Sequence, residues 1–330
     1  MSGLPFASPT LAAIAAARER LRGHVHVTPC WTWPSPALGA ALGESARVTA
    51  KLELWQRSGS FKARGAFLTM LALDAEQRAA GVTAVSAGNH ALAVADAARR
   101  VGTHAKVVMP RSADPRRIAA CEAAGASVVL ADDVHAAFAA SQRIAAEEGR
   151  RFLHPFESES IVLATATLGL EIVEQVPDVD AVVVPIGGGG LAAGIACGIA
   201  AARPACAVFG VEPEGADTMS RSFAAGEPRA IDAVRTIADS LGAPRAEPRT
   251  YTLCRRHLAG LVRVSDDALR QAMRVLHREL RLAVEPACAA STAAALGPLA
   301  VELSGRRVVL VLCGSNVDLE SVARHVVGVG

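Results

Sequence analysis

Residues 58–66 read Ser-Gly-Ser-Phe-Lys-Ala-Arg-Gly-Ala and lie between a short apolar segment and a run of helix-forming residues. The apolar segment 48–54 is predicted to form a strand, and residues 67–73 are predicted to form a helix. Lys62 is therefore expected in the first turn of a helix at the end of a sheet, with Ser60 as the N-cap. Small neighbours would exclude water there and favour the neutral amine, which can attack an aldehyde. A lysine on a hydrated surface is the alternative that this stretch leaves open.

Apolar segments alternate with amphipathic segments along most of the chain. Strands are expected at 48–54, 82–86, 105–109, 127–130, 181–185, 207–211, 261–264 and 307–312. Helices are expected at 11–21, 67–73, 91–101, 114–124, 133–148, 165–175, 191–202, 216–225 and, capped by Ser265, up to residue 280. Residues 34–36 and 229–249 are expected to be loops, and 152–157 a crossover. This alternation predicts an α/β fold with two doubly wound parallel-sheet domains that meet at a ligand cleft. The expected boundaries are 52–156 for a small domain, and 1–51 together with 157–330 for a large one.

Composition restricts the classes of partner. The chain has 330 residues, 51% of them apolar, and a formal net charge of +2 without a long run of Lys or Arg. These values argue against a nucleic-acid or membrane-surface role and leave a small-molecule partner. Residues 1–9 lack the charged start and apolar run of a secretory signal. The seven cysteines are scattered, without a Cys-x-x-Cys pair, which favours reduced thiols in a cytoplasmic protein over a zinc site or disulfides.

Two loops that follow predicted strands are suited to anions. Residues Ser86-Ala87-Gly88-Asn89-His90 precede a helix, whose first backbone N–H groups would suit a substrate carboxylate. The alternative is an ordinary helix start capped by Ser86 or Asn89. Residues Gly187-Gly188-Gly189-Gly190-Leu191 also lie between a strand and a helix, and unpaired N–H groups in such a turn form a nest for phosphate. A flexible connector is the alternative, and a dinucleotide-binding turn is disfavoured because only Glu212 lies at roughly the right distance.

A third loop, Cys313-Gly314-Ser315-Asn316, follows the last predicted strand and places a thiol at its tip. A buried thiol often serves only as a small apolar side chain, and that alternative stays open. Together with residues 60–66, 86–90 and 187–191, this loop resembles the motifs of the serine/threonine dehydratase (threonine ammonia-lyase) family. These are pyridoxal-phosphate enzymes of the tryptophan-synthase-β-like fold, also called fold type II. The likeness runs in order over nearly the whole chain, includes residues 284–287, and is to the short, catabolic members.

The resemblance implies a pyridoxal 5'-phosphate cofactor in the cleft, held by the large domain, with the substrate loop on the small one. Lys62 would form the Schiff base and take the substrate α-proton, and Phe61 would pack beside the cofactor. Asn89 would bond the ring hydroxyl, and Cys313 would face the pyridine nitrogen. A thiol with its reference pKa of about 8.5 stays neutral there, which favours prompt loss of a β-hydroxyl. The remaining implied contacts are with the phosphate, from Gly187, Gly188, Gly189, Gly190 and Leu191, and with the substrate, from Ser86, Ala87, Gly88, Asn89 and His90.

The implied activity is an ammonia-lyase that converts L-threonine, L-serine or both to a 2-keto acid and ammonia by α,β-elimination, in a homodimer. A serine or aspartate racemase is the nearest alternative, although family racemases carry serine where Ala87 stands. A 3-hydroxyaspartate dehydratase, a β-replacement enzyme and a non-catalytic metabolite-binding protein are the others. Glu212, Ala216 and Asp217 resemble a family cation site, but Thr218 stands where a second Asp is usual. A hydrated acidic loop is favoured, and a divalent or monovalent cation stays an open alternative.

Overall fold

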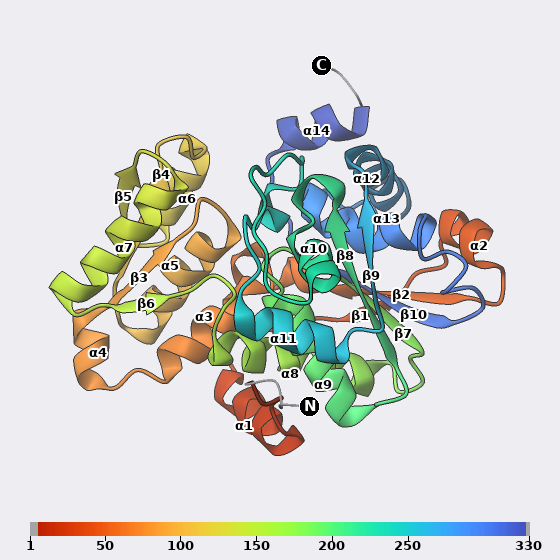
Figure 1. Cartoon of the computed structure of the whole chain (residues 1–330), viewed down its shortest axis with the longest axis horizontal. Coiled ribbons are helices and arrows are strands. Elements are labelled where there is room, and N and C mark those ends of the chain that lie inside the picture. The colour runs from red at the N-terminus through yellow and green to blue at the C-terminus, as the bar shows by residue number, and fades with distance from the viewer. Residues whose placement is uncertain (1–5, 328–330) are drawn as a thin grey trace.

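The computed structural model describes residues 6–327, which form two α/β units side by side (Figure 1). The sheet of the smaller unit has the strand order β5-β4-β3-β6, and the larger has the order β1-β2-β10-β7-β8-β9. Every neighbouring pair is parallel except β1 and β2, which pair antiparallel at one edge. The predicted α/β class with parallel sheets is therefore confirmed.

The smaller unit encloses its sheet between helices. Buried side chains of α5 pack against one face of β3 and β4, and those of α7 pack against the other face. Alternate residues of each strand supply the two interfaces, as expected for a strand covered on both sides. The strands are β3 (Val82–Val85), β4 (Ala105–Pro110), β5 (Ser127–Ala131) and β6 (Arg151–Leu153). The helices are α3 (Lys62–Leu71), α4 (Ala75–Ala80), α5 (Asn89–Val101), α6 (Pro115–Ala123) and α7 (Val134–Glu148).

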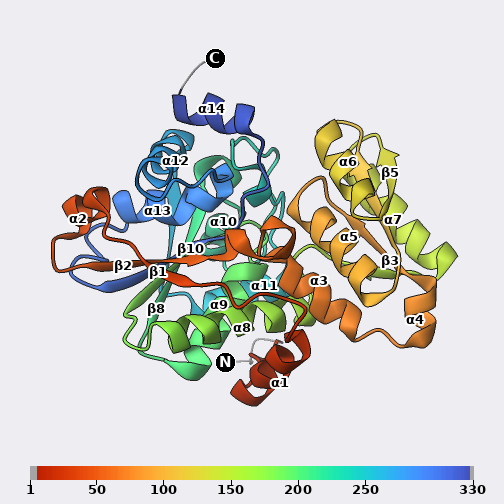
Figure 2. The same cartoon turned by 180° about the vertical axis from the view of Figure 1, so that it is seen from behind.

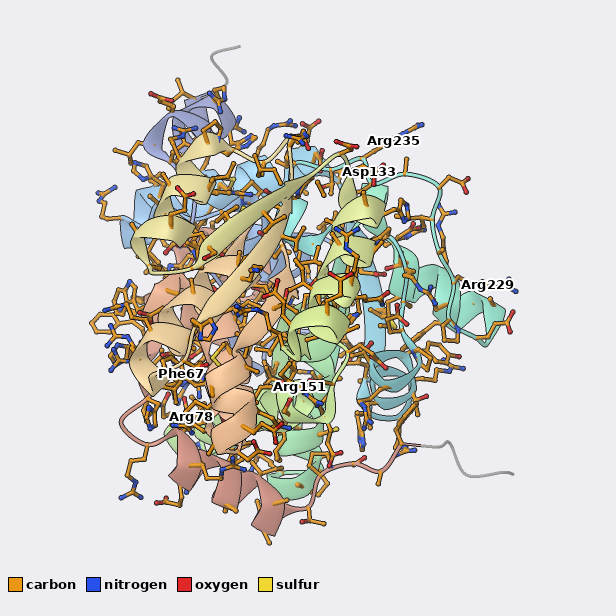
Figure 3. All side chains as sticks on the ribbon, turned by 90° about the vertical axis from the view of Figure 1, so that its left-hand side faces the viewer. Phe67, Arg78, Asp133, Arg151, Arg229 and Arg235 are labelled. Carbon is orange, nitrogen blue, oxygen red and sulfur yellow. The ribbon has the colours of Figure 1, made fainter. Side chains whose placement is uncertain are left out.

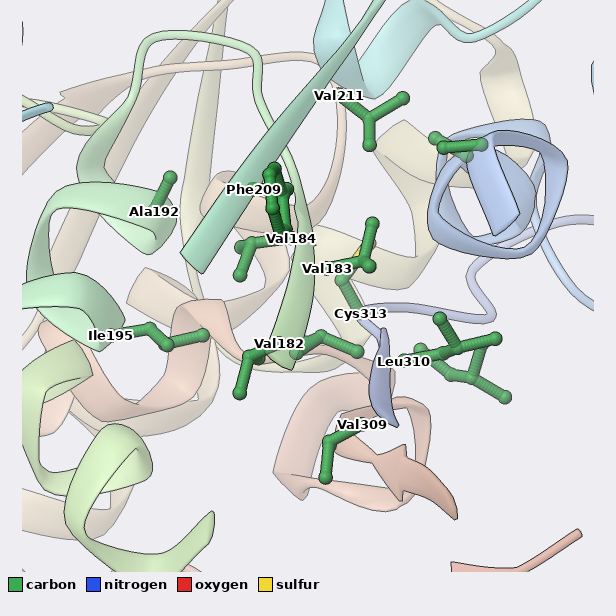
Figure 4. Packing of buried hydrophobic residues seen from close by; sticks show 14 of the residues in the cluster. Val182, Val183, Val184, Ala192, Ile195, Phe209, Val211, Val309, Leu310 and Cys313 are labelled. Atoms are coloured by element: carbon green, nitrogen blue, oxygen red, sulfur yellow. The ribbon is translucent and has the colours of Figure 1, made fainter. Parts of the chain in front are cut away.

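The larger unit is organised around continuous apolar strands. Side chains of β7, β8 and β10 pack with Ala192 and Ile195 of α9 in the main core (Figure 4). The strands are β1 (Cys30–Thr32), β2 (Arg47–Leu52), β7 (Ala181–Pro185), β8 (Ala207–Pro213), β9 (Gly260–Val264) and β10 (Arg307–Leu312). The helices are α1 (Leu11–Leu21), α2 (Pro36–Leu42), α8 (Glu159–Gln175), α9 (Gly190–Ala202), α10 (Thr218–Ala225), α11 (Pro248–His257), α12 (Asp266–Leu280), α13 (Ala290–Leu296) and α14 (Leu319–Val327). Helix α1 packs against α8 at the base of the molecule, as the view from behind shows (Figure 2).

Several predicted boundaries are confirmed and others are wrong. Ser265 caps α12 by accepting a hydrogen bond from the Ala268 N–H at 3.2 Å, as predicted. Ser60 does not cap α3, because its backbone is extended and pairs with Gly314 in an isolated bridge. Phe61 is the N-cap residue instead, and no side chain caps that helix. Tertiary pairing with the loop after β10 therefore overrides the local capping signal.

The predicted loops and crossover also contain regular structure. Residues 152–157 begin inside β6, a three-residue edge strand too short to show alternation. Ser35, expected in a loop, caps α2 by accepting from the Leu38 N–H. The predicted loop 229–249 runs into α11, which was not predicted. The N-terminus of α11 is bound by the distant carboxylate of Glu157, which accepts from the Arg249 and Thr250 N–H groups at 2.6 and 3.0 Å.

The two sheets correspond to the two predicted domains in outline. All strands of the smaller sheet lie within 52–156, whereas β2 of the larger sheet ends at Leu52. The division at these residues remains a prediction. Within residues 6–327, no helix has both the length and the apolar character needed to cross a membrane. All seven cysteines are free thiols. The absence of a secretory signal was predicted partly on residues 1–5, which lie outside the described part of the chain.

Candidate active site

The four sequence segments singled out above line one cavity of about 320 Å³ between the two units. Each segment follows a strand or starts a helix, so parallel strands of both sheets direct their carboxyl ends toward this space. Every residue predicted to bind cofactor or substrate is among the lining residues. They are Phe61, Lys62, Ser86, Ala87, Gly88, Asn89, His90, Gly187, Gly188, Gly189, Gly190, Leu191 and Cys313.

The amine of Lys62 is withdrawn from bulk water. Its Nζ donates a hydrogen bond to the Pro155 carbonyl oxygen at 2.6 Å and lies 5.1 Å from the centre of the Phe61 ring. Burial lowers the pKa of Lys62 to about 8, and the nearby Cys313 and Glu285 only partly oppose that shift. A substantial fraction of the amine is therefore neutral and nucleophilic near neutral pH.

The four-glycine turn is packed so closely that side chains do not fit. A Cβ atom on Gly188 would overlap the Phe156 ring, and one on Gly187 would lie 3.0 Å from the Leu241 Cα. Gly189 has a φ of +87°, in the left-handed region that favours glycine. Helix α9 starts at Gly190, so the first backbone N–H groups of that helix have no partner inside it. This turn is suited to hold a phosphate group against the helix start.

Pro155 and Phe156 connect the amine to this turn. Pro155 accepts the hydrogen bond from Lys62, and the ring of the next residue lies against Gly188. The amine is therefore neither in open solvent nor remote from the turn. An aldehyde captured at Lys62 could carry an anionic group that rests at the start of α9.

The loop 86–90 also presents a helix start to the cavity. Helix α5 begins at Asn89, and its N-cap residue Gly88 supplies no side-chain hydrogen bond. Ser86 bonds within the loop instead, because its Oγ accepts from the Gly88 N–H at 3.1 Å. The reading of Ser86 or Asn89 as an ordinary side-chain cap is therefore wrong. His90 is a neutral side chain, since burial lowers its pKa to about 3 and its Nε2 donates to the Leu153 carbonyl oxygen at 3.0 Å.

Asn89 is held by two partners that fix its amide. Its Nδ2 donates to the two carboxylate oxygens of Glu285 at 2.8 and 3.0 Å. Its Oδ1 accepts from the Asn316 Nδ2 at 2.6 Å, and Asn316 also donates to the Ser58 carbonyl oxygen. The amide NH₂ carries two hydrogens and meets only one carboxylate, so it keeps capacity toward a group in the cavity.

Cys313 lies at the end of β10 and stays protonated. A hydrogen bond with the Cys288 thiol and burial both raise the pKa of Cys313 well above its usual value. The thiol therefore presents a neutral, weak hydrogen-bonding group to the cavity. An ionised carboxylate at this point would act differently, because it would stabilise a positive charge on a neighbouring ring nitrogen.

Other lining residues were not predicted as site residues. Glu285 is 2% exposed, and burial raises its pKa to about 7 although Asn89 donates to it. Its only sequence signal was the Glu-Pro pair in a stretch noted for family likeness. Phe156, Arg117 and Asp239 gave no local signal, since each lies at the cavity through tertiary packing. Arg117 of α6 pairs with Asp239 of the other unit at 2.6 Å and so joins the two units at the cavity.

The candidate cation ligands already have protein partners. Glu212 accepts hydrogen bonds from the Met219 and Ser220 N–H groups, both at 2.7 Å, at the start of α10. Asp217 forms ion pairs with Arg221 at 2.7 Å and with Arg263 at 3.0 Å. Among the described residues, no group of three or more His, Cys, Asp or Glu side chains is arranged to hold a metal ion. Residues 212–217 carry no proposal of a cation site.

The fold and this cavity define an enzyme that captures an aldehyde phosphate on a lysine. The tight glycine cradle, the partly neutral amine and the protonated thiol together fit pyridoxal 5'-phosphate. Comparison with known proteins agrees, because residues 21–314 match the family described as pyridoxal-phosphate dependent enzyme. The chain belongs to that family and uses this cofactor.

Relatives narrow the comparison further. The chain is 54% identical to a phenylserine dehydratase of Ralstonia pickettii over 319 residues, which cover 96% of each protein. It is 35% identical to an L-threonine ammonia-lyase of Thermotoga maritima, covering 96% of this chain and 77% of the relative. The structure of maize serine racemase superposes with a TM-score of 0.90 at 34% identity, covering 96% of this chain and 97% of the racemase. The predicted tryptophan-synthase-β-like fold and family are confirmed by these matches.

Proposed function

We propose that this protein is a pyridoxal-phosphate-dependent ammonia-lyase that dehydrates β-hydroxy α-amino acids to 2-keto acids and ammonia. One observation carries the proposal: an amine with a pKa of about 8 shares a cavity with a phosphate nest, a carboxylate-binding helix start and a protonated thiol. The dehydratase and ammonia-lyase relatives support the same reaction class.

The roles of the residues follow from their positions. Bound pyridoxal phosphate supplies an aldehyde for the amine and a conjugated ring that accepts electrons from the substrate α-carbon. The Lys62 amine takes the α-proton, and the backbone of residues 86–90 holds the substrate carboxylate beside it. Cys313 stays neutral toward the ring nitrogen, and Asn89 orients the ring through its amide. Loss of the α-proton and the β-hydroxide gives an enamine, which water converts to the 2-keto acid and ammonia.

Two substrate ranges are consistent with this site. L-threonine and L-serine are the substrates expected from the sequence, and the Thermotoga relative supports threonine. A larger β-substituent is supported by the phenylserine dehydratase, which is the more similar of these two relatives. A 3-hydroxyaspartate dehydratase is less well supported, because the cavity arginine, Arg117, is already paired with Asp239 at 2.6 Å.

Racemisation is the alternative that the maize enzyme raises. It requires a second proton carrier on the face of the α-carbon opposite Lys62. Ala87 lies in the loop that lines the cavity there, and its methyl group cannot carry a proton. This observation favours elimination over racemisation.

A direct assay tests the proposal. The protein is loaded with pyridoxal phosphate and incubated with L-serine, L-threonine and phenylserine, and 2-keto acid and ammonia are measured together with D-serine. We expect equimolar 2-keto acid and ammonia, and a loss of turnover in Lys62→Ala with an unchanged circular dichroism spectrum. Formation of D-serine faster than pyruvate would overturn elimination as the main activity. A protein that does not take up the cofactor would instead be a metabolite-binding protein.

A further inference from the structure

One wall of the cavity is formed by apolar side chains of the smaller unit. Val85 and Pro110 end the adjacent strands β3 and β4, and Val134 and Phe138 lie on the first turns of α7. The larger unit contributes the opposite side of the cavity through the glycine turn and residues 239–244. None of the four wall residues carries a charge or a hydrogen-bonding side chain.

This wall adjoins the loop assigned to the substrate carboxylate. The Ser86 N–H donates to the Val108 carbonyl oxygen at 3.3 Å, so the loop begins beside the end of β4. Pro110 ends that strand, and α7 packs against β3 and β4. A substrate held by its carboxylate at residues 86–90 therefore has the wall within reach of its side chain.

Phe138 belongs to a row of aromatic rings along the cavity. Its ring centre lies 6.4 Å from that of Phe152, at an edge-on angle of 64°, and 6.2 Å from that of His154. His154 in turn meets the Phe156 ring edge-on at 4.7 Å. Edge-to-face arrangements at such distances stabilise one another, and a further ring placed in the cavity would extend the row.

The other surfaces of the cavity are already used. Leu241 lies against Gly187, so this part of the larger unit supports the phosphate turn. Arg117 and Asp239 neutralise each other across the cleft at 2.6 Å. Val134, in contrast, is 46% exposed although it is apolar and lines the cavity. An apolar group bound there would remove its side chain from water.

We propose that the wall formed by Val85, Pro110, Val134 and Phe138 is the subsite for an aromatic β-substituent, so that the substrates are aryl-β-hydroxy amino acids such as phenylserine. This inference rests on the proposed dehydratase function and specifies the class of substrate. Phe138 supplies the ring contact, and Val134 covers the outer edge of the substrate ring. Serine and threonine leave this subsite largely unfilled and are poorer substrates.

Figure 3 views the molecule from the side of the smaller unit and labels Asp133, which caps α7 directly before Val134. Asp133 and Arg235 appear at the same end of the molecule in this view. Asp133 accepts a hydrogen bond from the Ala136 N–H at 2.8 Å, which anchors the first turn of α7. The wall is therefore carried by a capped helix and not by a free loop, which favours a fixed subsite.

The test compares substrates on the holoenzyme. Values of kcat/KM for phenylserine and for L-serine are measured in the wild type, in Phe138→Ala and in a matched control, Phe223→Ala. Phe223 is also a half-buried phenylalanine in an edge-on pair, with Tyr251 at 6.0 Å, but it does not line the cavity. We expect the ratio of phenylserine to serine kcat/KM to fall by about tenfold in Phe138→Ala, since loss of apolar contact in a pocket changes selectivity by about 10–200-fold. The control should keep the wild-type ratio.

Two further measurements keep the inference open to refutation. Val134→Thr changes an exposed residue without threatening the fold and should lower the same ratio by about threefold, since a hydroxyl replaces a methyl group. L-phenylalanine, which has no β-hydroxyl to lose, should bind the holoenzyme more tightly than L-alanine, and Phe138→Ala should reduce that preference. An unchanged ratio in both cavity variants would overturn the aromatic subsite. Absence of 2-keto acid from every substrate would instead overturn the proposed function itself.

Discussion

Lys62 is nucleophilic because burial lowers the pKa of its amine from 10.5 to about 8. The neutral fraction of the amine therefore rises through pH 8 in the cofactor-free protein. We predict that the rate of pyridoxal phosphate capture by the apoprotein rises with pH and levels off above about pH 8. Stopped-flow visible absorbance measures that rate, with N-acetyl-lysine amide as the unburied control. A midpoint near 10 would show that the amine is fully hydrated.

Glu285 stores a pH dependence of stability. Burial raises the pKa of its carboxyl from 4.5 to about 7, so the folded protein keeps a proton that the unfolded chain has lost between these pH values. Stability from this group is therefore lost as pH rises from 4.5 to 7 and is not regained above pH 7. We predict that Glu285→Gln removes this loss, which is on the order of 2 kcal/mol between pH 5 and pH 8.

Urea unfolding of the apoprotein at pH 5 and pH 8 measures the effect of Glu285→Gln. The surface variant Glu302→Gln provides the control, because Glu302 is half exposed and forms an ion pair with Arg306 on the same helical surface. The control should show the wild-type difference between the two pH values. The same difference in Glu285→Gln would contradict a buried, partly protonated carboxyl.

At the scale of elements, the glycine turn before α9 determines how closely an anion approaches the helix. Gly189 has a φ of +87°, and a Cβ there would lie 2.8 Å from the Met219 Cε and 3.1 Å from the Thr250 Cβ. We predict that Gly189→Ala weakens pyridoxal phosphate binding at least tenfold, measured by titration of the apoprotein, because the turn must change shape. The matched variant Gly39→Ala should keep the affinity and raise stability by about 0.5–1 kcal/mol, since Gly39 lies inside α2 with open space around it. Equal affinity in both variants would remove the phosphate role of the turn.

A buried ionic cluster joins the helix that carries Lys62 to two other elements. Arg64 of α3 bonds Glu53 at 2.7 and 2.8 Å and Glu171 of α8 at 2.6 and 2.9 Å. Lys51 of β2 also donates to Glu171 at 2.9 Å. The four charges are fully or almost fully buried and balance one another, so each depends on the presence of its partners.

We predict that Arg64→Met lowers the free energy of unfolding by about 3–5 kcal/mol, because it leaves buried carboxylates uncompensated. The control is Arg18→Met, which breaks a surface pair with Glu174 and should cost about 1 kcal/mol or less. Urea unfolding of both variants measures the difference. Similar losses in the two variants would show that the cluster does not behave as a buried network.

The whole molecule was expected from the sequence to form a homodimer, and that remains a prediction. Exposed apolar side chains such as Trp31, Leu319 and Val301, which is 92% exposed, are available for such contact. We predict a particle mass about twice the 34.0 kDa of one chain, measured by sedimentation equilibrium at several concentrations. A single-chain mass at micromolar concentration would contradict the homodimer.

The chain by itself determined the elements and the order of the site motifs. Periodicity placed α1, β7 and β10 at their observed limits, because continuous apolar strands and amphipathic helices are local patterns. It missed α11, whose N-terminus is bound by Glu157 from far along the chain, and it assigned Ser60 as a cap although that residue pairs with Gly314. Both errors occurred where long-range contacts replace the local signal.

The site divides in the same way. Lys62, the glycine turn and Cys313 were found from the sequence because the chemistry requires those residue types directly after strands. Only the tertiary structure brought Glu285 to Asn89 and Arg117 to Asp239, and only it assembled Phe138 and Phe156 into one wall. These contacts join residues far apart in the chain, and no local pattern encodes which distant side chains will share a cavity. The sequence thus determined the reaction chemistry, whereas the fold decided the pKa values and the shape of the space offered to the substrate.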